Sequence, residues 1–450
     1  MRKLAFSLCL LLSLSLCLSS LASAAYMPDE NKDFKTNSQA VYLYNTDTGT
    51  VIYQKNEQMK LQPASTAKIM TAVLALENTD DLDEEFTYPS YIFNMLEPGV
   101  SQADVRVGET MTMRKALYAL MLQSDCFSAL AIADRIGDGD IDAFIQMMND
   151  KAKELGAVNT NFANPHGLYD ENNYTTAYDL FLITKYAVDV DGFMEIASTP
   201  VKDIGPTNIH SEGYNMITTI LPMIKSSEYY YEPIRGIKTG TLDEVGRNYV
   251  SMASKNGYTY ILVLLGAPIY DSSSTGEDGS PVPLAQNTVF QDAINIYEWA
   301  FNGFESKMLL EKGKSAGEVK VRLSKDADHV ALLASEDFSA LVPSEYASGV
   351  VLQPHIPETV DAPVKRGDKI GTVDIVLATE VLGTVDLLAE ADISRSQTLY
   401  ILDYIKGLFK SFWVKFAVIL VILIIALYIT LMVLRNRYRK RYRRAHRHRG

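Results

Sequence analysis

Cysteine is scarce in this sequence, which has three among its 450 residues: Cys9, Cys17 and Cys126. The first two lie in an N-terminal segment that we expect to be removed, so the mature chain would keep Cys126 alone. A single cysteine cannot form an intramolecular disulfide bond. The fold must therefore be stabilised by hydrophobic cores, which favours an ordinary exported globular protein over a small disulfide-based scaffold.

Positive charge is also scarce outside the two ends of the chain. Residues 25–414 carry 30 Lys and Arg residues against 55 Asp and Glu residues, a net charge near −25. A nucleic-acid partner would require a basic face, so this charge argues against one. The basic cluster that exists, residues 435–450, holds nine Lys or Arg and no acid. It predicts a cytoplasmic tail beside a membrane and not an RNA-binding segment.

Histidine is rare, with six in the chain, and these six show neither an H-E-x-x-H motif nor another paired metal-ligand spacing. No glycine-rich phosphate loop follows a candidate strand. We therefore expect no metal and no cofactor, and the sequence argues against nucleotide chemistry.

Long apolar runs occur at the two ends of the chain. Residues 1–24 combine Arg2 and Lys3, an apolar stretch and the small residues Ala22-Ser23-Ala24, the pattern of a secretory signal peptide. The alternative, a first membrane anchor, requires a longer run. Residues 416–434 are 19 positions without a charge, long enough for a transmembrane helix. The body of the protein should then lie outside the cytoplasmic membrane, with the tail inside.

The body of the chain is too long for one hydrophobic core, and its hydrophobic pattern changes near residue 306. Strand patterns at both ends of residues 25–305, with helical patterns between them, predict one sheet with helices packed over it. Residues 306–395 alternate in short runs typical of a small all-β domain, and residues 396–415 form a juxtamembrane linker. The elements predicted within 25–305 are strands at 40–44, 51–53, 247–253 and 258–265 and helices at 65–77, 114–122, 128–136, 143–155 and 291–301.

The motif Ser65-Thr66-Ala67-Lys68 is the first candidate for chemistry. On a helix, residues three apart share a face, so the Ser65 hydroxyl and the Lys68 amine can meet. A desolvated lysine can lose its proton and act as a base for a serine nucleophile. Alone, this pattern is common and equally typical of an ordinary helix start.

The second motif is Lys238-Thr239-Gly240-Thr241, which precedes the last two predicted strands of the larger domain. On an edge strand it would place a cation and two hydroxyls beside a cleft, and the glycine would allow close approach to the backbone. The two motifs in this order form a penicillin-recognising pattern.

On these residues the sequence resembles the low-molecular-mass penicillin-binding proteins, the D-alanyl-D-alanine carboxypeptidase family of serine peptidases. The resemblance covers residues 39–305 well, and the β-rich region and C-terminal membrane attachment also match the family's layout. Further matching segments are Thr48-Gly49, Tyr53–Asn56, Pro63–Ala72, Asn164–Leu168 and Tyr174–Asp179.

The resemblance implies an α/β (α+β) domain of the serine β-lactamase/transpeptidase type, with an antiparallel sheet flanked by helices. A small all-β domain and a C-terminal transmembrane helix would follow it. The implied substrate is the D-Ala-D-Ala end of peptidoglycan stem peptides, and β-lactams are implied ligands. The implied catalytic residues are Ser65, Lys68 and Ser124, and the implied substrate-binding residues are Lys238, Thr239, Gly240, Thr241 and Cys126.

The middle motif of the family, S-x-N, departs from the pattern here. Its match is Ser124-Asp125-Cys126, with Cys126 in place of the asparagine. A thiol cannot supply both functions of an amide side chain, so we expect impaired acylation or a different substrate contact. Cys126 as a nucleophile is a weaker interpretation than a small buried thiol filling the asparagine's space.

Several alternatives stay open. No arginine follows Gly266-Ala267-Pro268, where several relatives place the one that binds the substrate carboxylate, so Thr239, Thr241 or Arg247 would have to serve. His166 is more simply a residue of a structural loop than a catalytic group. The rivals to an enzyme are a wall-binding or penicillin-sensing protein without turnover, and, within the same chemistry, a β-lactamase.

Overall fold

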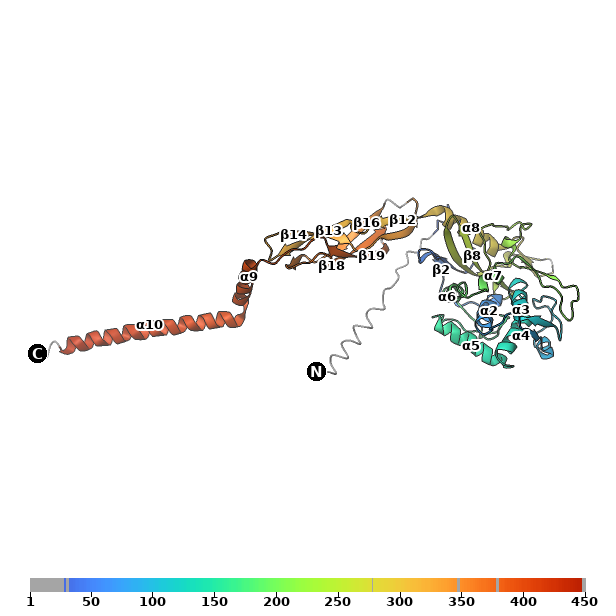
Figure 1. The fold of residues 1–450 in the computed structure, drawn as a ribbon, viewed down its shortest axis with the longest axis horizontal. Helices are drawn as coiled ribbons and strands as arrows, with labels where there is room; N and C mark the ends of the chain where they lie inside the picture. Colours follow the sequence, from blue (N-terminus) through green and yellow to red (C-terminus); the bar gives the residue numbers. More distant parts are fainter. Residues whose placement is uncertain (1–27, 30–31, 277, 346–348, 378–379, 447–450) are drawn as a thin grey trace. The chain divides into compact units, whose positions relative to one another are not determined.

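The computed structural model describes residues 28–29, 32–276, 278–345, 349–377 and 380–446 (Figure 1). The predicted signal peptide, residues 1–24, lies outside these ranges. The described chain divides into two compact units. One contains the chain up to Lys307 and a return segment from Ala340, and the other contains Met308–Ser339 and the chain from Gly349.

The larger unit is built on one five-stranded antiparallel sheet in the order β2-β1-β9-β8-β7. β1 near the start of the chain pairs with β9 over two hundred residues later, with Ala40 opposite Leu265. This confirms the prediction that both ends of the domain complete one sheet. The strands are β1 (Ala40–Asn45), β2 (Thr50–Lys55), β7 (Lys238–Leu242), β8 (Gly246–Lys255) and β9 (Tyr258–Ala267).

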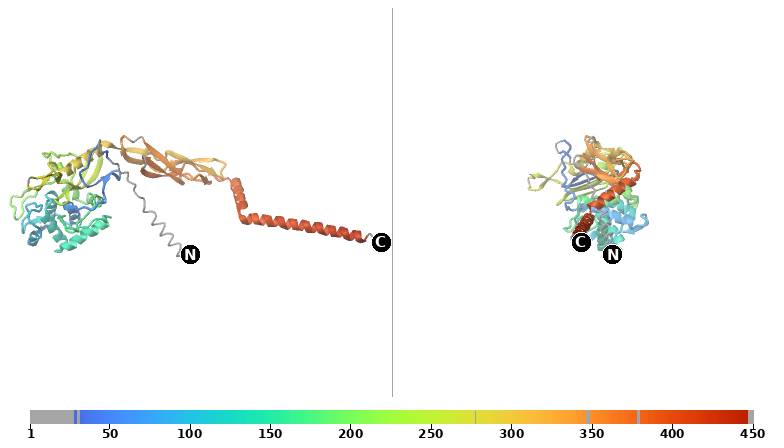
Figure 2. Two further views of the ribbon diagram at one scale, coloured as in Figure 1. Left: turned by 180° about the vertical axis from the view of Figure 1, so that it is seen from behind. Right: turned by 90° about the vertical axis from the view of Figure 1, so that its left-hand side faces the viewer.

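The alternation of side chains along each strand divides the interior of this unit into two cores. In β9, Ile261 and Val263 face the larger helical cluster, whereas Leu262 and Leu264 face α8 (Thr288–Gly303). Figure 2 shows the helical cluster from behind, coloured from blue (α2) through cyan to green (α6 and α7). Its helices are α2 (Lys68–Glu77), α3 (Met113–Leu122), α4 (Cys126–Ile136), α5 (Ile141–Glu154), α6 (Ala177–Ala187) and α7 (Phe193–Ala197).

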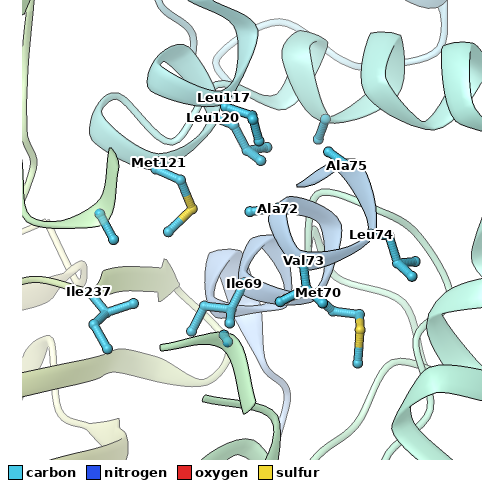
Figure 3. Packing of buried hydrophobic residues seen from close by; sticks show 14 of the residues in the cluster. Ile69, Met70, Ala72, Val73, Leu74, Ala75, Leu117, Leu120, Met121 and Ile237 are labelled. Carbon is cyan, nitrogen blue, oxygen red and sulfur yellow. The ribbon is translucent and has the colours of Figure 1, made fainter. Parts of the chain in front are cut away.

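Helix α2 is buried on every side, because its sequence is apolar around the whole circumference. Figure 3 shows its side chains among those of Leu117, Leu120 and Met121 of α3 and Ile237 before β7, all members of the same core. Such close packing leaves the helix little room to shift or rotate. Lys68, the first residue of α2, is therefore held in a fixed place.

The structure corrects the predicted start of this helix. The sequence predicted one helix from residue 65 to 77, but Ala64–Ala67 form a separate 3-10 turn, η1, and the α-helix begins at Lys68. Ala64 has a φ of 50°, a left-handed conformation just before Ser65. Because the backbone turns sharply at Ala64, Ser65 lies on the 3-10 turn η1 and not on the α-helix.

Helix caps explain why other predicted boundaries were a few residues late. α4 begins at Cys126 and not at residue 128, because the Asp125 carboxylate accepts a hydrogen bond from the Ser128 backbone N–H. Thr112, Asp140 and Thr176 cap α3, α5 and α6 in the same way. The sequence prediction missed α6 and α7.

The smaller unit contains a six-stranded sheet in the order β16-β18-β19-β14-β13-β17, with its own core around Leu332, Val373 and Leu387. This agrees with the predicted all-β character. β12 (Phe304–Leu310) and β15 (Phe338–Pro343) pair in a separate ribbon. The sheet strands are β13 (Ser315–Arg322), β14 (His329–Ala334), β16 (Val350–His355), β17 (Thr359–Asp361), β18 (Lys369–Leu377) and β19 (Glu380–Ala389).

Two helices follow the β strands: α9 (Gln397–Lys410), in the predicted linker, and α10 (Phe412–His446). α10 is one continuous helix (Figure 1), and the predicted span at residues 416–434 lies within it. Across the described ranges, one helix is long and apolar enough to cross a membrane, Phe412–Arg439.

The segment that leads into β1 is attached to α8 by one buried carboxylate. Asp292 is 1% exposed. Its Oδ1 accepts hydrogen bonds from the Asn37 backbone N–H (3.1 Å) and side-chain Nδ2 (2.9 Å). Its Oδ2 accepts from the Ser38 backbone N–H (2.8 Å) and hydroxyl (2.7 Å). Asp292 therefore ties the first strand to the last helix of the larger unit.

Asp292→Ala should lower the free energy of unfolding of the larger unit by about 2 to 4 kcal/mol, because several donors lose their acceptor at once. Urea denaturation followed by tryptophan fluorescence measures this change. Asp278→Ala removes an exposed carboxylate that binds a neighbouring serine, and it should leave the midpoint unchanged. Equal midpoints for the two variants would contradict the role given to Asp292.

Candidate active site

A cavity of about 380 Å³ opens between η1 and the edge strand β7 of the larger unit. Ser65, Ser124 and three residues of the second predicted motif, Thr239–Thr241, lie on its wall. Other groups come from β8, from α8 and from the segment between β6 (Asn215–Ile217) and the 3-10 turn η3 (Leu221–Met223). The lining residues are Ser65, Ser101, Ser124, Thr219, Leu221, Thr239, Gly240, Thr241, Arg247, Asn248, Asn287, Val289 and Phe290.

The predicted serine–lysine pair is in contact. Lys68 Nζ lies 3.0 Å from Ser65 Oγ, 2.6 Å from the His166 carbonyl oxygen and 3.5 Å from Cys126 Sγ. Lys68 is fully buried, and this burial lowers the pKa of its amine, although the neighbouring Cys126 and Asp125 oppose the shift. A lysine in this environment can more readily release its proton and accept one from a serine.

The 3-10 turn that carries Ser65 is fixed from the sheet by Asn248. Its Nδ2 donates to the carbonyl oxygens of Gln62 and Pro63, both at 2.9 Å, and its Oδ1 accepts from the Gly266 N–H at 2.8 Å. Asn248 is 1% exposed and lies on β8 opposite Gly240. Sequence reasoning missed this residue, since an asparagine inside a strand carries no signal of such a role.

The loop at Asn164–Leu168 supports the turn from the other side. The Pro165 carbonyl accepts from the Thr71 hydroxyl (2.6 Å), and the His166 carbonyl accepts from Lys68. A Cβ on Gly167 would lie 1.8 Å from the Ala64 carbonyl oxygen, so only glycine fits here. Burial, and secondarily Lys68, lowers the pKa of the His166 imidazole to about 3. His166 thus contacts Lys68 through its backbone, in a structural loop, as the sequence analysis expected.

The second motif lies on β7, at the edge of the sheet, as predicted. Lys238 is fully buried, and burial together with the charge of Lys68 holds its pKa well below the usual range. Thr239 and Thr241 point to the opposite face of the strand from Lys238 and Gly240. The Thr239 hydroxyl lies 2.8 Å from that of Thr219.

Gly240 allows the edge strand to approach the serine. A Cβ at this position would lie 2.9 Å from the Ser65 backbone nitrogen and 3.2 Å from that of Thr66. The glycine is needed for close approach and not for its backbone conformation, since its φ is not positive.

Two residues of the middle motif, Ser124 and Cys126, also reach the site. Ser124 lines the cavity with a left-handed backbone, φ 59°. Cys126 is 1% exposed, and its Sγ lies between Lys68 Nζ and the Ser124 carbonyl oxygen, 3.8 Å from the latter. The thiol therefore occupies a buried position beside the lysine, as expected of a side chain that fills the asparagine's space.

Arg247 is the charged side chain at the mouth of the cavity. It lies on β8 opposite Thr241, lines the cavity, and donates from Nη1 to the Pro268 carbonyl oxygen at 3.1 Å. Its guanidinium has further donors for an anionic ligand. Within the described ranges, no group of three or more His, Cys, Asp or Glu side chains is placed to hold a metal ion.

Gly240→Ala should reduce acylation of Ser65 by at least about a hundredfold, because the added methyl group would displace β7 or the turn that carries the nucleophile. The rate of covalent labelling by a fluorescent penicillin measures this. Gly303→Ala, whose Cβ would meet no atom within 4 Å, is the matched control and should label at the wild-type rate. Normal labelling of Gly240→Ala would show that the close approach is not required.

The fold and the site together define a class: an antiparallel sheet flanked by helices, with a buried lysine against a serine and a K-T-G edge strand opposite, is typical of serine acyltransferases of the penicillin-recognising type. The family model "D-alanyl-D-alanine carboxypeptidase" matches residues 27–269, and the model "Penicillin-binding protein 5, C-terminal domain" matches residues 304–395. The chain belongs to the D-alanyl-D-alanine carboxypeptidase family of serine peptidases.

Individual relatives agree with this assignment. The chain is 28% identical over 409 residues to the D-alanyl-D-alanine carboxypeptidase DacF of Bacillus subtilis, covering 89% of this chain and 98% of that protein. The structure of the carboxypeptidase DacD from Francisella tularensis matches with a TM-score of 0.63 at 19% identity, over 83% of this chain and 98% of that one. The latter likeness concerns the fold alone.

A third relative bears on the unusual middle motif. The Streptomyces K15 DD-transpeptidase matches with a TM-score of 0.53 at 27% identity, over 60% of this chain and 99% of that one. Its solved structures include single alanine mutants of a serine and of a cysteine two positions further along. Ser124 and Cys126 have the same spacing.

Proposed function

We propose that this protein removes the terminal D-alanine of peptidoglycan stem peptides through an acyl-enzyme on Ser65, with Lys68 as the base. One observation carries the proposal: Lys68 Nζ lies 3.0 Å from Ser65 Oγ in a fully buried setting that lowers the pKa of the amine. The family assignment supports the substrate, and the K-T-G edge strand faces the serine across a cavity of suitable size for a peptide end.

Acylation begins when Ser65 Oγ attacks the carbonyl carbon between the two D-alanines and its proton passes to Lys68 Nζ. The tetrahedral intermediate collapses when the C–N bond breaks. The leaving amine takes the proton held by Lys68 by way of Ser124, with the Lys238 side chain nearby, and D-alanine departs. Water then attacks the ester carbon and gives a proton to Lys68. The C–O bond to Ser65 breaks, Lys68 returns this proton to Ser65 Oγ, and the shortened peptide is released.

The backbone N–H groups of Ser65 and Thr241 form the oxyanion hole in this scheme. Support comes from the close approach of β7 to η1, where a Cβ on Gly240 would almost touch the Ser65 nitrogen. Donors on the two facing segments can then converge on one oxygen atom.

The substrate carboxylate is held by Arg247 with the hydroxyls of Thr239 and Thr241. All three line the cavity, and Arg247 pairs with Thr241 across the β7–β8 ladder. A guanidinium offers paired donors that match a carboxylate. This assigns the role that the sequence analysis left open among these three residues.

Cys126 lacks the amide that the family's asparagine would offer to the substrate. The proposed enzyme therefore acylates more slowly than one with the asparagine. The alternative of a protein that binds stem peptides without turnover is not favoured over the enzyme, since the named relatives of this chain are carboxypeptidases.

We further propose that α10 anchors the protein in the cytoplasmic membrane, with residues 435–450 on the cytoplasmic side and the catalytic domain outside. The apolar length of the helix and its basic C-terminal end support this orientation. The domain plan has a signal peptide at 1–24, a catalytic domain at 25–305, a β-rich spacer at 306–395 and a linker at 396–415.

Ser65→Ala should abolish D-alanine release from diacetyl-Lys-D-Ala-D-Ala, because no acyl-enzyme can form. Cys126→Asn should release D-alanine faster than wild type, by roughly tenfold, as expected for one restored hydrogen bond to the substrate. A coupled D-amino-acid oxidase assay on the protein without α10 measures both rates. Cys126→Ser, which restores no amide, is the matched control. If wild type releases no D-alanine while Cys126→Asn does, the protein is a disabled binder and the enzymatic proposal fails.

Arg247→Leu should lower kcat/KM roughly ten- to a hundredfold, the effect of one lost charged hydrogen bond. The loss should vanish for the same peptide with its C-terminal carboxylate converted to an amide. Arg322→Leu, an exposed arginine of the smaller unit, should leave both rates unchanged. If Arg247→Leu lowered kcat/KM equally for the acid and the amide peptide, another group would have to bind the carboxylate.

A further inference from the structure

Asn287 lines the catalytic cavity, but the proposed mechanism does not use it. Its side-chain Oδ1 is enclosed and has no hydrogen-bond partner within the part of the chain that the structure describes. An enclosed amide without a partner costs free energy, so folded proteins rarely contain one. The carboxamide can present its oxygen or its NH2 group, because a half turn about the Cβ–Cγ bond exchanges them. Such a side chain on a cavity wall is a candidate for contact with a ligand.

The neighbours of Asn287 fix its position and leave its carboxamide available. The Asn287 backbone N–H donates to the Tyr229 hydroxyl at 2.7 Å. The next residue, Thr288, donates from its hydroxyl to the Pro268 carbonyl oxygen at 3.0 Å. Arg247 Nη1 donates to the same carbonyl oxygen at 3.1 Å. This shared acceptor brings Asn287 and the guanidinium to the same end of the cavity.

The sheet brings the hydroxyls of β7 to this end as well. Residues directly opposite each other in an antiparallel pair point to the same face of the sheet. Arg247 is opposite Thr241. Tyr249 is opposite Thr239, and its ring contacts that of Phe290 in the first turn of α8, with the centroids 5.2 Å apart. The face of β7 that carries the two threonines is therefore the face that the start of α8 covers.

The start of α8 adds partial positive charge here. The first N–H groups of a helix have no partner within the helix, and the aligned peptide dipoles favour an anion beside them. Asn287 is the N-cap residue, but in the described helix its side chain makes no capping hydrogen bond, and the first turn contains no acid. The nearest acid of the helix, Asp292, binds Asn37 and Ser38 instead. An anion at this helix end would therefore meet no acid of the first turn.

The other residues of the cavity wall also suit a small anionic group. Among the described residues that line the cavity, Arg247 carries a charge and none is an acid. Leu221, Val289 and Phe290 add apolar surface beside these donors. A terminal D-alanine consists of a carboxylate, a methyl group and the amide that is cleaved. The guanidinium, the helix end and the Asn287 carboxamide can donate to the carboxylate, while the apolar side chains contact the methyl group.

We propose that Asn287 is a specificity-determining residue, whose carboxamide donates a hydrogen bond to the carboxylate of the terminal D-alanine beside Arg247 at the start of α8. The inference rests on the proposed function, since it needs a stem peptide in the cavity. Asn287 takes no part in the proton transfers between Ser65 and Lys68. Its substitution should therefore change the preference for a free carboxylate and leave the bond-breaking steps intact.

The test compares Asn287→Asp and Asn287→Ala with the wild-type full-length protein in detergent. The substrates are diacetyl-Lys-D-Ala-D-Ala and the same peptide with a C-terminal amide. Asp has nearly the shape of Asn and caps helices well, so this variant should keep or raise the thermal midpoint. Its charge should lower kcat/KM for the acid peptide roughly a hundredfold, because like charges repel. Asn287→Ala, which loses one donor, should lower it roughly tenfold.

Neither variant should lower kcat/KM for the amide peptide, which carries no negative charge at this end. Mass spectrometry of the released D-alanine and D-alaninamide measures both rates. Asn295→Asp is the matched control on the same helix, because this side chain accepts a hydrogen bond from Gln291 and does not line the cavity. It should keep the wild-type rates on both peptides.

Two results would overturn the inference. One is an equal loss for the Asp and Ala variants on the acid peptide, or a loss that is equal on the acid and the amide peptide, since a structural residue would behave in this way. The other is the failure of both variants to fold, which would make Asn287 a residue of the fold. If only Asn287→Asp fails to fold, the acid and amide rates of Asn287→Ala decide.

The outcomes for the two proposals are separate. If wild type releases D-alanine at no measurable rate, the proposed function fails. If wild type releases D-alanine and the variants show no selective loss on the acid peptide, only the role of Asn287 fails.

Discussion

The site depends on the burial of Lys68 against Ser65. An amine in water is protonated at neutral pH and cannot take a proton, so the base must be removed from solvent and still be held within reach of the hydroxyl. The structure achieves this with a helix that is apolar on all sides and a turn pinned by Asn248 from the sheet. The core of the larger unit thereby places Ser65 and Lys68 in contact as well as stabilising the fold.

The same burial fixes which groups surround the amine of Lys68. Besides Ser65, it contacts the Cys126 thiol and the His166 backbone carbonyl oxygen. In this chain the middle motif therefore combines a serine at the cavity wall with a buried thiol where the family has an amide.

The apolar helix α10 and the cavity depend on different kinds of sequence signal. α10 is defined by length and apolarity alone, which any sequence window reveals. The cavity, by contrast, is assembled from segments far apart in the chain, such as Ser65, Ser124 and Thr239. Arg247 is a further case, because strand pairing places it opposite Thr241 at the cavity.

The sequence by itself determined the two chemical motifs, the strand pattern of the sheet, the all-β character of the second region and the apolar span, because each is a local or periodic signal. The contact between Ser65 and Lys68 also followed from the sequence, because the two residues are three positions apart. Only the tertiary structure decided that Ser65 lies on a 3-10 turn, that Asn248 holds the residues before this turn, and that Arg247 faces Thr241. It also decided that the buried Asp125 carboxylate accepts a hydrogen bond from the Ala103 N–H. These features depend on contacts between residues far apart in the chain, for which hydrophobic pattern and spacing carry no information.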